Sequence, residues 1–392
     1  MLFPELPVRS DNKMKYINDD KINEFAKLIS EILTMKQIRD LNIFFGKKRK
    51  TIIYGAGKTG KVALGFLKRY GVDVDFFLDQ QASKIQYIDD VPVYPPESKY
   101  TDRDANVIIA IFNHNTDVNL IADFLINLGF HKLLTFTELY IGMAEVLPDQ
   151  YWLGTPMLYK SHVKELAKVF GLLKDQISRD LFLSLLRFRI TGDPKYSPIP
   201  QSDEIYFPDN ILKSNGIQHF IDCGAFTGDT LTSLKAKYGT VRSIRAFEPD
   251  QENFKKLKSI NQKNSFSKDT RLYPYAVWSS EAQKRFSSES SASSSIDKSG
   301  ERNIQCVSID NILRDYTPTY LKMDVEGSEL EALKGAENKI ISAKPFLAIS
   351  LYHTPEHLWQ IPLYIKSIEP SYKFYIRVHG FNGYDIVLYA HV

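Results

Sequence analysis

Residues 220–231 have the sequence FIDCGAFTGDTL, and they carry the strongest indication of fold in this chain. An apolar run ends at Asp222, a turn with Gly224 and Gly228 follows, and Asp229 opens a segment with helical spacing. Glycine has no side chain and adopts positive φ, so such a turn lets the backbone approach a ligand closely. A strand, a glycine turn and a helix in this order predict an open α/β sheet that binds its ligand at the carboxyl ends of the strands.

Strands are predicted on both sides of this turn. The candidates are residues 219–222 before it and residues 243–247, 273–276, 320–324 and 346–351 after it. Residues 373–379 and 384–390 flank Gly380 and Gly383 with no room for a helix, so they predict an antiparallel hairpin at the sheet end. The stretch Ser287–Gly300 is rich in serine and has little to bury, which predicts a mobile loop, either a lid over a substrate or a plain surface loop.

The charges around the first turn indicate the kind of ligand. Asp222 and Asp229 would repel a pyrophosphate, because like charges about 4 Å apart cost roughly 1 kcal/mol even in water. They suit a positively charged ligand such as S-adenosylmethionine, with its ammonium and sulfonium groups. Glu248 ends the next strand, where a carboxylate can accept hydrogen bonds from both ribose hydroxyls. The predicted cofactor contacts are Asp222, Gly224, Ala225, Phe226, Thr227, Gly228, Asp229, Thr230, Glu248, Pro249, Ala276, Val277 and Asp324.

A second glycine turn, GAGKTG at residues 55–60, has the opposite charge. It contains Lys58 and no acid, and backbone N–H groups at the start of a helix suit a diphosphate. Asp79 ends the next strand and could take ribose hydroxyls. The predicted second nucleotide site is Gly55, Gly57, Lys58, Thr59, Gly60 and Asp79.

Alternating elements surround this second turn and predict a parallel sheet. The strands are expected at residues 51–54, 74–78 and 107–112, with Thr135 and Phe136 in a last strand, and the helices at 61–70 and 118–128. Asn113, His114 and Asn115 follow a strand, so they either line a pocket or form a polar turn with an asparagine cap.

The chain is therefore expected to be an α/β protein with two Rossmann-like domains. The predicted divisions are an N-terminal helical segment at 1–45, a nucleotide-binding-like domain at 46–150, a helical connector at 151–204 and a seven-stranded C-terminal domain at 205–392. The first segment holds one amphipathic helix at residues 18–41. In the connector, Ser161 is expected to cap a helix, and residues 191–210 are expected to be extended.

Composition excludes several classes of protein. The 392 residues carry a net charge of +3 spread along the chain, so nothing indicates a nucleic-acid partner. Two cysteines, Cys223 and Cys306, are too few for a disulfide framework. The N-terminus lacks the apolar core of a signal peptide, and no apolar run is long enough to span a bilayer. We expect a cytoplasmic protein, and a homodimer is a further expectation.

The C-terminal half resembles the FkbM family of methyltransferases. The resemblance covers about residues 205–392 and rests above all on LKMDVEGSELEALKGA at residues 321–336. FIDCGAFTGDT, AFEPD, YAVW and SIDNIL also match. It implies the seven-stranded class I methyltransferase fold, with Tyr206 and Phe207 near the cofactor pocket or simply packed in the core. Residues 51–140 resemble, more weakly, the small Rossmann-type domain of nucleotide-sugar-modifying enzymes.

Four residues are the candidates for catalysis, because methyl transfer to a hydroxyl requires removal of its proton. Lys322, Asp324 and Glu326 share one face if their strand continues that far. The alternatives are a buried ion pair for Lys322 and a helix cap for Glu326. His353 follows a strand and is the preferred general base, the alternative being a structural histidine.

A divalent metal held by Asp324, Glu326, His353 and His379 is a further reading of these side chains. Their spacing forms no recognised metal signature, so the expectation is that no metal is needed.

The function predicted is an S-adenosylmethionine-dependent O-methyltransferase, acting on a sugar hydroxyl of a glycan or nucleotide-sugar precursor. Two alternatives stay open: an NAD(P)-dependent sugar-modifying oxidoreductase that uses the second glycine turn, and a methyltransferase of a secondary metabolite with a non-catalytic N-terminal binding domain. Against the oxidoreductase, the N-terminal segment shows no Tyr-x-x-x-Lys or similar hydride-transfer residues.

Overall fold

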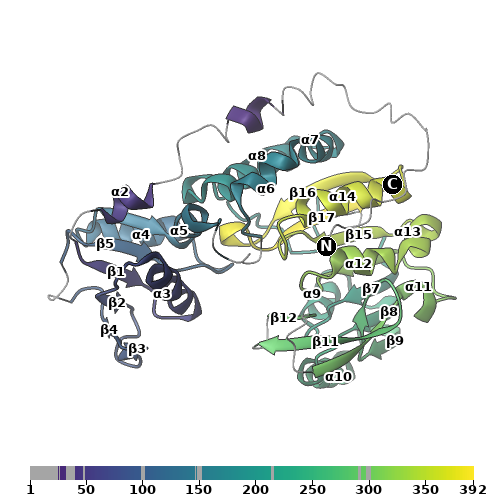
Figure 1. Ribbon diagram of the computed structural model, residues 1–392. Helices are drawn as coiled ribbons and strands as arrows, with labels where there is room; N and C mark the ends of the chain where they lie inside the picture. Colours follow the sequence, from purple (N-terminus) through teal and green to yellow (C-terminus); the bar gives the residue numbers. More distant parts are fainter. Residues whose placement is uncertain are drawn as a thin grey trace.

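The structure is a computed structural model, and it describes most of the 392 residues. The described residues are 25, 27–31, 40–46, 49–98, 102–145, 147, 152–212, 216–289, 293–296 and 302–392. The chain builds two mixed α/β units side by side, with a layer of helices across one end of both (Figure 1). The predicted α/β class is confirmed, and parallel pairing dominates both large sheets.

The N-terminal α/β unit contains a six-stranded sheet in the order β3-β4-β2-β1-β5-β6. Its strands are β1 (Thr51–Tyr54), β2 (Phe76–Leu78), β3 (Tyr87–Ile88), β4 (Val91–Tyr94), β5 (Asn106–Ile109) and β6 (Lys132–Thr135). Its helices are α2 (Leu41–Phe45), α3 (Lys58–Tyr70), α4 (Val118–Asn127) and α5 (Phe136–Met143). β1 and β5 are buried along their whole length, as expected for central strands of a parallel sheet. Phe136 was expected in the last strand, but it begins α5, which Thr135 caps with its side chain.

The helical layer follows this unit. It consists of α6 (Pro156–Ser161), α7 (Val163–Leu172) and α8 (Gln176–Thr191), followed by the short 3₁₀ helix η1 (Pro194–Tyr196). The predicted cap at Ser161 is wrong, because Ser161 ends α6 and the residue before α7 is His162, which makes no side-chain cap hydrogen bond. Of the helix expected at 18–41, the described residues 27–31 are helical, and the rest lies largely outside the described residues.

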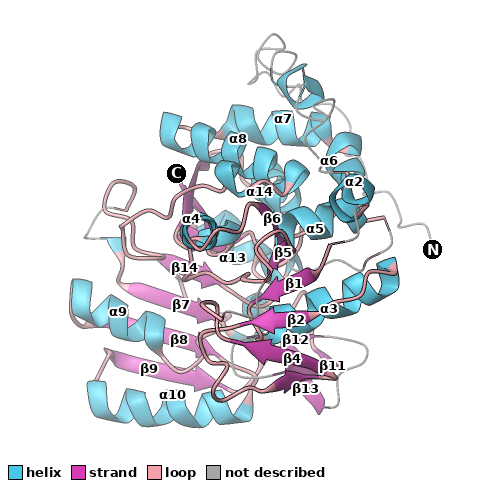
Figure 2. Ribbon diagram, turned by 90° about the vertical axis from the view of Figure 1, so that its left-hand side faces the viewer, coloured by secondary structure: helices cyan, strands magenta, loops and turns pink. Residues whose placement is uncertain are grey.

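The C-terminal domain contains a seven-stranded sheet in the order β16-β17-β15-β14-β7-β8-β9. Its strands are β7 (His219–Cys223), β8 (Val241–Phe247), β9 (Ser267–Tyr273), β14 (Tyr320–Met323), β15 (Phe346–Ser350), β16 (Lys373–Val378) and β17 (Ile386–His391). Its helices are α9 (Asp229–Tyr238), α10 (Gln251–Asn264), α12 (Glu329–Lys334), α13 (Glu337–Ala343) and α14 (His357–Ile368). Figure 2 shows α9 and α10 beside strands β7, β8 and β9. The predicted hairpin is confirmed, since β16 and β17 pair antiparallel.

A small four-stranded sheet, in the order β10-β13-β11-β12, departs from expectation. It consists of β10 (Ala276–Val277), β11 (Ala282–Glu289), β12 (Ser293–Ile296) and β13 (Arg302–Val307), and the short helix α11 (Ile309–Ile312) follows. The strand expected at 273–276 is wrong, because β9 ends at Tyr273. The described part of Ser287–Gly300 is also not a loop: β11 and β12 pair there in antiparallel register. Ladder hydrogen bonds are made by the backbone, so a stretch with little apolar side chain can still pair.

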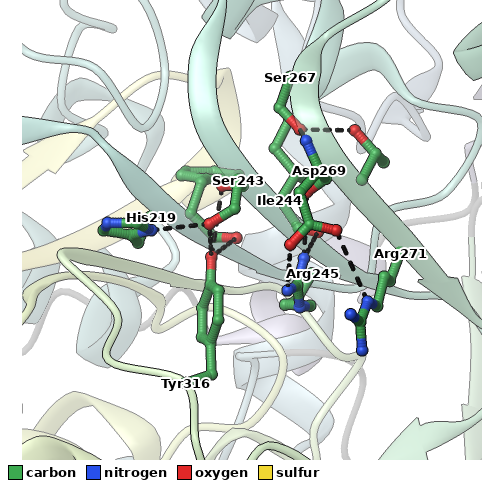
Figure 3. A network of polar contacts seen from close by, with 10 residues as sticks. His219, Ser243, Ile244, Arg245, Ser267, Asp269, Arg271 and Tyr316 are labelled. Atoms are coloured by element: carbon green, nitrogen blue, oxygen red, sulfur yellow. Dashed lines mark hydrogen bonds and ion pairs between the residues drawn. The ribbon is translucent and has the colours of Figure 1, made fainter.

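The amino ends of β7, β8 and β9 are held together by a polar network (Figure 3). The Ser243 hydroxyl hydrogen-bonds with Nδ1 of His219 at 2.7 Å and with the Tyr316 hydroxyl at 2.9 Å. Arg245 donates to a carboxylate oxygen of Asp269 at 2.6 Å. These residues line an open hollow, but their polar groups bond to one another, which fits a structural role. No helix among the described residues is both long and apolar enough to cross a membrane.

Candidate active site

A cavity of about 560 Å³ lies at the carboxyl ends of β7, β8 and β14. This is the edge at which open α/β sheets bind ligands, and the volume is in the usual range for a small-molecule site. The predicted cofactor residues that line it are Gly224, Phe226, Asp229, Thr230, Glu248, Pro249, Ala276, Val277 and Asp324. Four others expected to contact the cofactor are not among its lining residues: Asp222, Ala225, Thr227 and Gly228.

The glycine turn after β7 is packed against the end of β14. Gly224 has φ +81°, and a Cβ there would lie 1.8 Å from the carbonyl oxygen of Asp324. Gly228 has φ +93° and precedes α9, which begins at Asp229. Both positions require a positive φ that other residues rarely adopt. The turn therefore brings α9 and the end of β14 to one side of the cavity.

Glu248 is a buried carboxylate at the end of β8. Its Oε2 accepts the backbone N–H of Phe226 at 2.9 Å, and its Oε1 accepts that of Asp250 at 2.8 Å. Burial raises the pKa of Glu248 to about 7, although these two hydrogen bonds act in the opposite direction. Each oxygen keeps a lone pair that can accept a further hydrogen bond from a ligand.

Asp222 does not face the cavity, which corrects its expected contact with the cofactor. It is fully buried, and its Oδ1 lies 3.0 Å from Nζ of Lys322. Lys322 lines the cavity and also donates to the Gly224 carbonyl at 2.7 Å. Burial alone would lower the pKa of Lys322, but the carboxylates of Asp222, Asp324 and Asp229 raise it. A buried group needs a partner for its charge, and these two residues supply it to each other. Lys322 is thus a buried ion pair, the alternative considered for it.

Asp324 and Glu326 both line the cavity but do not share a strand face. β14 ends at Met323, and Glu326 has φ +51°, so the chain has left the strand before Glu326. Asp324 accepts a hydrogen bond from the Tyr206 hydroxyl at 2.8 Å, which places that aromatic ring at the cavity as the family resemblance implied. Burial raises the pKa of Glu326 to about 7, although His353 acts in the opposite direction.

His353 lies behind these two carboxylates and is not among the residues that line the cavity. Its Nδ1 hydrogen-bonds with Oε1 of Glu329 at 2.8 Å, while Nε2 lies 3.4 Å from Oε2 of Glu326 and 3.5 Å from Oδ1 of Asp324. Burial alone would lower the pKa of His353, but Glu329 and Glu326 raise it to about 10. In this arrangement His353 touches the carboxylates and is separated from a ligand in the cavity.

Glu329 joins two buried histidines below the cavity. Its Oε2 lies 3.1 Å from Nδ1 of His357, and its Oε1 also accepts the Val325 N–H at 2.9 Å. Burial alone would raise the pKa of Glu329, but His353 and His357 hold it well below the ordinary value.

Asp324, Glu329 and His353 form a cluster in which each residue offers a ligand atom within 4.8 Å of the others, so Glu329 stands in this cluster where the set considered from sequence had Glu326. His379, the fourth member of the metal set considered from sequence, bonds elsewhere through Nε2 to the Tyr389 hydroxyl at 2.9 Å.

The N-terminal unit forms one wall of the same cavity. Phe112, Asn113 and His114, which follow β5, line it together with Asp385 from the C-terminal domain. Nδ1 of His114 lies 3.3 Å from Oδ2 of Asp385, and the His114 carbonyl accepts the Phe381 N–H at 2.8 Å. Asn113 and His114 therefore form a pocket wall, and the loop is also a polar turn, because the Asn113 side chain accepts the Asn115 N–H at 2.9 Å, although Asp117 rather than an asparagine caps α4.

Sequence reasoning missed other lining residues, chiefly Tyr352, Tyr384 and Asp385. Tyr352 directly precedes His353, and Asp385 follows the hairpin turn, so both positions were near predicted elements. Their orientation depends on how the hairpin and the N-terminal unit pack, which no local pattern encodes.

The second glycine turn lies after β1, outside the residues that line this cavity. Asp79 accepts the Ala56 N–H at 2.7 Å and the Gln81 N–H at 2.7 Å, just as Glu248 accepts two backbone N–H groups. A Cβ at Gly60 would lie 2.0 Å from the Gly55 carbonyl oxygen, so the helix packs directly on the turn. A Cβ at Gly57 would meet nothing within 4 Å, which leaves open space in front of the helix start.

Comparison with known proteins agrees with this geometry. Residues 222–382 match the family described as the methyltransferase FkbM domain. The crystal structure of methyltransferase FkbM from Methylobacillus flagellatus KT is similar, with a TM-score of 0.76 and 21% identity over 95% of this chain and 100% of that chain. A putative rRNA-methylase from Clostridium thermocellum also matches, with a TM-score of 0.30 and 10% identity over 46% of this chain and 89% of that one.

No curated protein matches the chain. The likeness to the Methylobacillus structure shows a shared fold, and the family match rests on the part of the chain that forms the cavity. Residues 222–382 of this chain are therefore a methyltransferase FkbM domain.

Proposed function

We propose that this protein is an S-adenosylmethionine-dependent O-methyltransferase that acts on a sugar hydroxyl of a glycan or nucleotide-sugar precursor. The observation that carries the proposal is Glu248, a buried carboxylate at the end of β8 that faces a cavity in an FkbM methyltransferase domain. A carboxylate at this position accepts hydrogen bonds from vicinal ribose hydroxyls.

The charges of the cavity suit a cationic methyl donor. Asp229, Glu248, Asp324, Glu326 and Asp385 line it, whereas its cationic lining residues are Lys322 and His114. Each of these two is paired with a carboxylate, and in the case of Lys322 the partner Asp222 lies outside the cavity lining. The remaining acidic groups attract an ammonium or sulfonium group and repel a diphosphate.

The reaction proposed is an in-line displacement. The acceptor oxygen forms a bond to the methyl carbon, the carbon–sulfur bond breaks, and its electron pair stays on sulfur as S-adenosylhomocysteine. The acceptor hydroxyl loses its proton to a carboxylate of the cavity, and we propose Asp324 or Glu326 for this role because both line it. His353 would act through these two carboxylates, as a positioning residue in place of the base that the sequence indicated.

The acceptor side of the cavity fits a polyhydroxylated ring. Several aromatic residues line the cavity, and those that would pack against the apolar face of a sugar are Phe112, Tyr206, Tyr352 and Tyr384. Asn113 and Asp385 also line the cavity, and in this proposal their side chains hydrogen-bond with the hydroxyls of the sugar. The second glycine turn would hold the nucleotide of such an acceptor, since the space in front of Gly57 is open.

Calorimetric titration with S-adenosylmethionine tests the cofactor. The wild type should bind it, and Glu248→Ala should bind it much more weakly. Asp79→Ala is the matched control, because Asp79 is also a strand-end acid that accepts an N–H of a glycine turn, but it lies in the other unit. Equal binding by Glu248→Ala and wild type, or no binding by wild type, would reject the proposal.

Thermal shift tests the acceptor class. A ligand that binds the native protein raises its melting temperature, so a panel of UDP-, GDP- and CDP-sugars should contain at least one that does. No shift from any of them would leave the N-terminal unit as a scaffold. The cytoplasmic location and the homodimer stay predictions.

A further inference from the structure

One ring nitrogen of His353, Nε2, is buried beside two carboxylates. Its side chain is 3% exposed, and Nε2 makes no hydrogen bond to any residue that the structure describes. This nitrogen is directed at two carboxylates, with Oε2 of Glu326 at 3.4 Å and Oδ1 of Asp324 at 3.5 Å. A buried polar atom without a hydrogen bond destabilises the folded protein, so we expect Nε2 to have a binding partner besides the protein's own side chains.

Nε2 is separated from each of the two carboxylate oxygens by about the distance between neighbouring ligands of one cation. Ligands bound at about 2.1 Å lie roughly 3.0 Å apart around an octahedral ion and roughly 3.4 Å apart around a tetrahedral one. The separations of 3.4 and 3.5 Å around Nε2 are near these values. They are long for good hydrogen bonds between a ring nitrogen and a carboxylate.

Glu329 fixes the imidazole in the orientation that a metal ligand needs. Its Oε1 accepts a hydrogen bond from Nδ1 at 2.8 Å, and the opposite ring nitrogen, Nε2, is therefore directed toward Asp324 and Glu326. Glu329 is itself held by the Val325 N–H and lies beside His357, and it is fully buried. A carboxylate behind the second nitrogen is the usual support of a metal-bound histidine.

We propose that Nε2 of His353 and the carboxylates of Asp324 and Glu326 bind a divalent cation beside the cavity. Two carboxylates with one imidazole suit a first-row ion such as Mn²⁺, and Mg²⁺ or Zn²⁺ are the alternatives to compare. Asp324 and Glu326 line the cavity, so the ion would have open coordination positions on the side of the acceptor. This reverses the expectation, drawn from residue spacing, that no metal is needed.

The use of the ion rests on the proposed function. A cation bound here would coordinate the acceptor hydroxyl and lower its pKa, so that the oxygen attacks as an alkoxide; its proton would pass to solvent, because Asp324 and Glu326 would then hold the ion. The site itself stands on the geometry around His353 and does not depend on the identity of the methyl donor.

Electron paramagnetic resonance of MnCl₂ titrated into the full chain tests the site, because the six-line signal of free Mn²⁺ fades as the ion binds. The wild type should bind Mn²⁺, and Glu326→Gln and His353→Gln should each weaken binding by at least about tenfold. Glu248→Gln is the matched control: it removes a carboxylate from the same cavity, but not from the cluster, so Mn²⁺ binding should stay unchanged.

Two results would overturn the site: no Mn²⁺, Mg²⁺ or Zn²⁺ binding by the wild type, or equal Mn²⁺ binding by the wild type and Glu326→Gln. The folding of each variant is first checked by circular dichroism, and S-adenosylmethionine binding by the wild type is measured separately by calorimetry. If His353→Gln fails to fold, Asp324→Asn replaces it as the second ligand variant. Metal binding without cofactor binding would reject the proposed function and keep the site, and cofactor binding without metal binding would do the reverse.

Discussion

At the scale of single residues, Glu248 gives the cofactor site a predictable pH dependence. Its pKa is raised to about 7, so it is mostly neutral at pH 6 and mostly ionised at pH 8. The ionised form accepts ribose hydroxyl hydrogen bonds better, and hydrogen bonds to charged groups contribute about 1.5–3 kcal/mol. Calorimetry should therefore show S-adenosylmethionine binding weaken by up to roughly tenfold from pH 8 to pH 6. In Glu248→Gln the affinity should be low and nearly independent of pH over this range; a wild type with no such dependence would contradict the assignment.

The buried ion pair of Lys322 and Asp222 gives a second prediction. Lys322→Met leaves the Asp222 charge without its partner in a position with no solvent, which typically costs about 3–5 kcal/mol of stability. Urea denaturation should show this loss. The double variant Asp222→Asn/Lys322→Met should recover much of it, because neither charge is then buried alone. If the stability losses of the single variants Lys322→Met and Asp222→Asn simply add in the double variant, the two residues do not stabilise each other.

These residues also show what local sequence can predict. The glycine turn, Glu248 and Asp324 were identified because a strand, a glycine and a strand-end acid occur at fixed spacing. The partner of Asp222 was not identified from the sequence. Its pairing with Lys322 depends on the register of two neighbouring parallel strands, β7 and β14. His353 was expected to face the acceptor because it follows a strand. The end of a strand predicts at which edge of the sheet a side chain lies, but not which neighbouring side chain it bonds to.

At the scale of elements, the two glycine turns predict different responses to substitution. Gly224→Ala places a Cβ 1.8 Å from the Asp324 carbonyl oxygen at φ +81°, so it should cost at least about 1–2 kcal/mol and abolish cofactor binding. Gly57→Ala has φ −86° and open space, so stability should be unchanged or slightly raised. Chemical denaturation distinguishes them. If the second turn binds a diphosphate, Gly57→Ala should also remove any thermal shift caused by a nucleotide sugar.

Strands were predicted well where the sequence has a continuous apolar run, and poorly where segments with polar side chains pair through their backbones. β1, β7, β8 and β15 are buried and were found close to their true bounds. β9 lies at a sheet edge with much of its polar sequence exposed, so its pattern gave no apolar signal. β11 and β12 were missed because serine-rich sequence resembles a loop in composition, whereas backbone hydrogen bonds decide whether it pairs.

At the scale of the whole molecule, the N-terminal unit and the hairpin of the C-terminal domain meet at the cavity. The Asn382 side chain donates to the carbonyls of Asn113 at 2.8 Å and Thr116 at 2.9 Å. The wall that carries Asn113 and His114 is thereby fixed to the turn between β16 and β17. The N-terminal unit, which the sequence suggested as a nucleotide binder with a loop that could line a pocket, thus contributes a wall to the proposed acceptor site.

The contact between His114 and Asp385 makes the docking of this wall dependent on pH. The hydrogen bond to Asp385 raises the pKa of His114. Because the pKa is higher in the docked state, the stabilisation is fully present below the undocked value of about 6.5 and is lost as pH rises through the raised value. The Phe381 amide, which donates to the His114 carbonyl, should have a larger hydrogen-exchange protection factor at pH 6 than at pH 8. In His114→Ala this difference should vanish, whereas Asn382→Ala should lower protection at both pH values and keep the difference. Equal protection at the two pH values in the wild type would mean that the ion pair does not hold the wall in place.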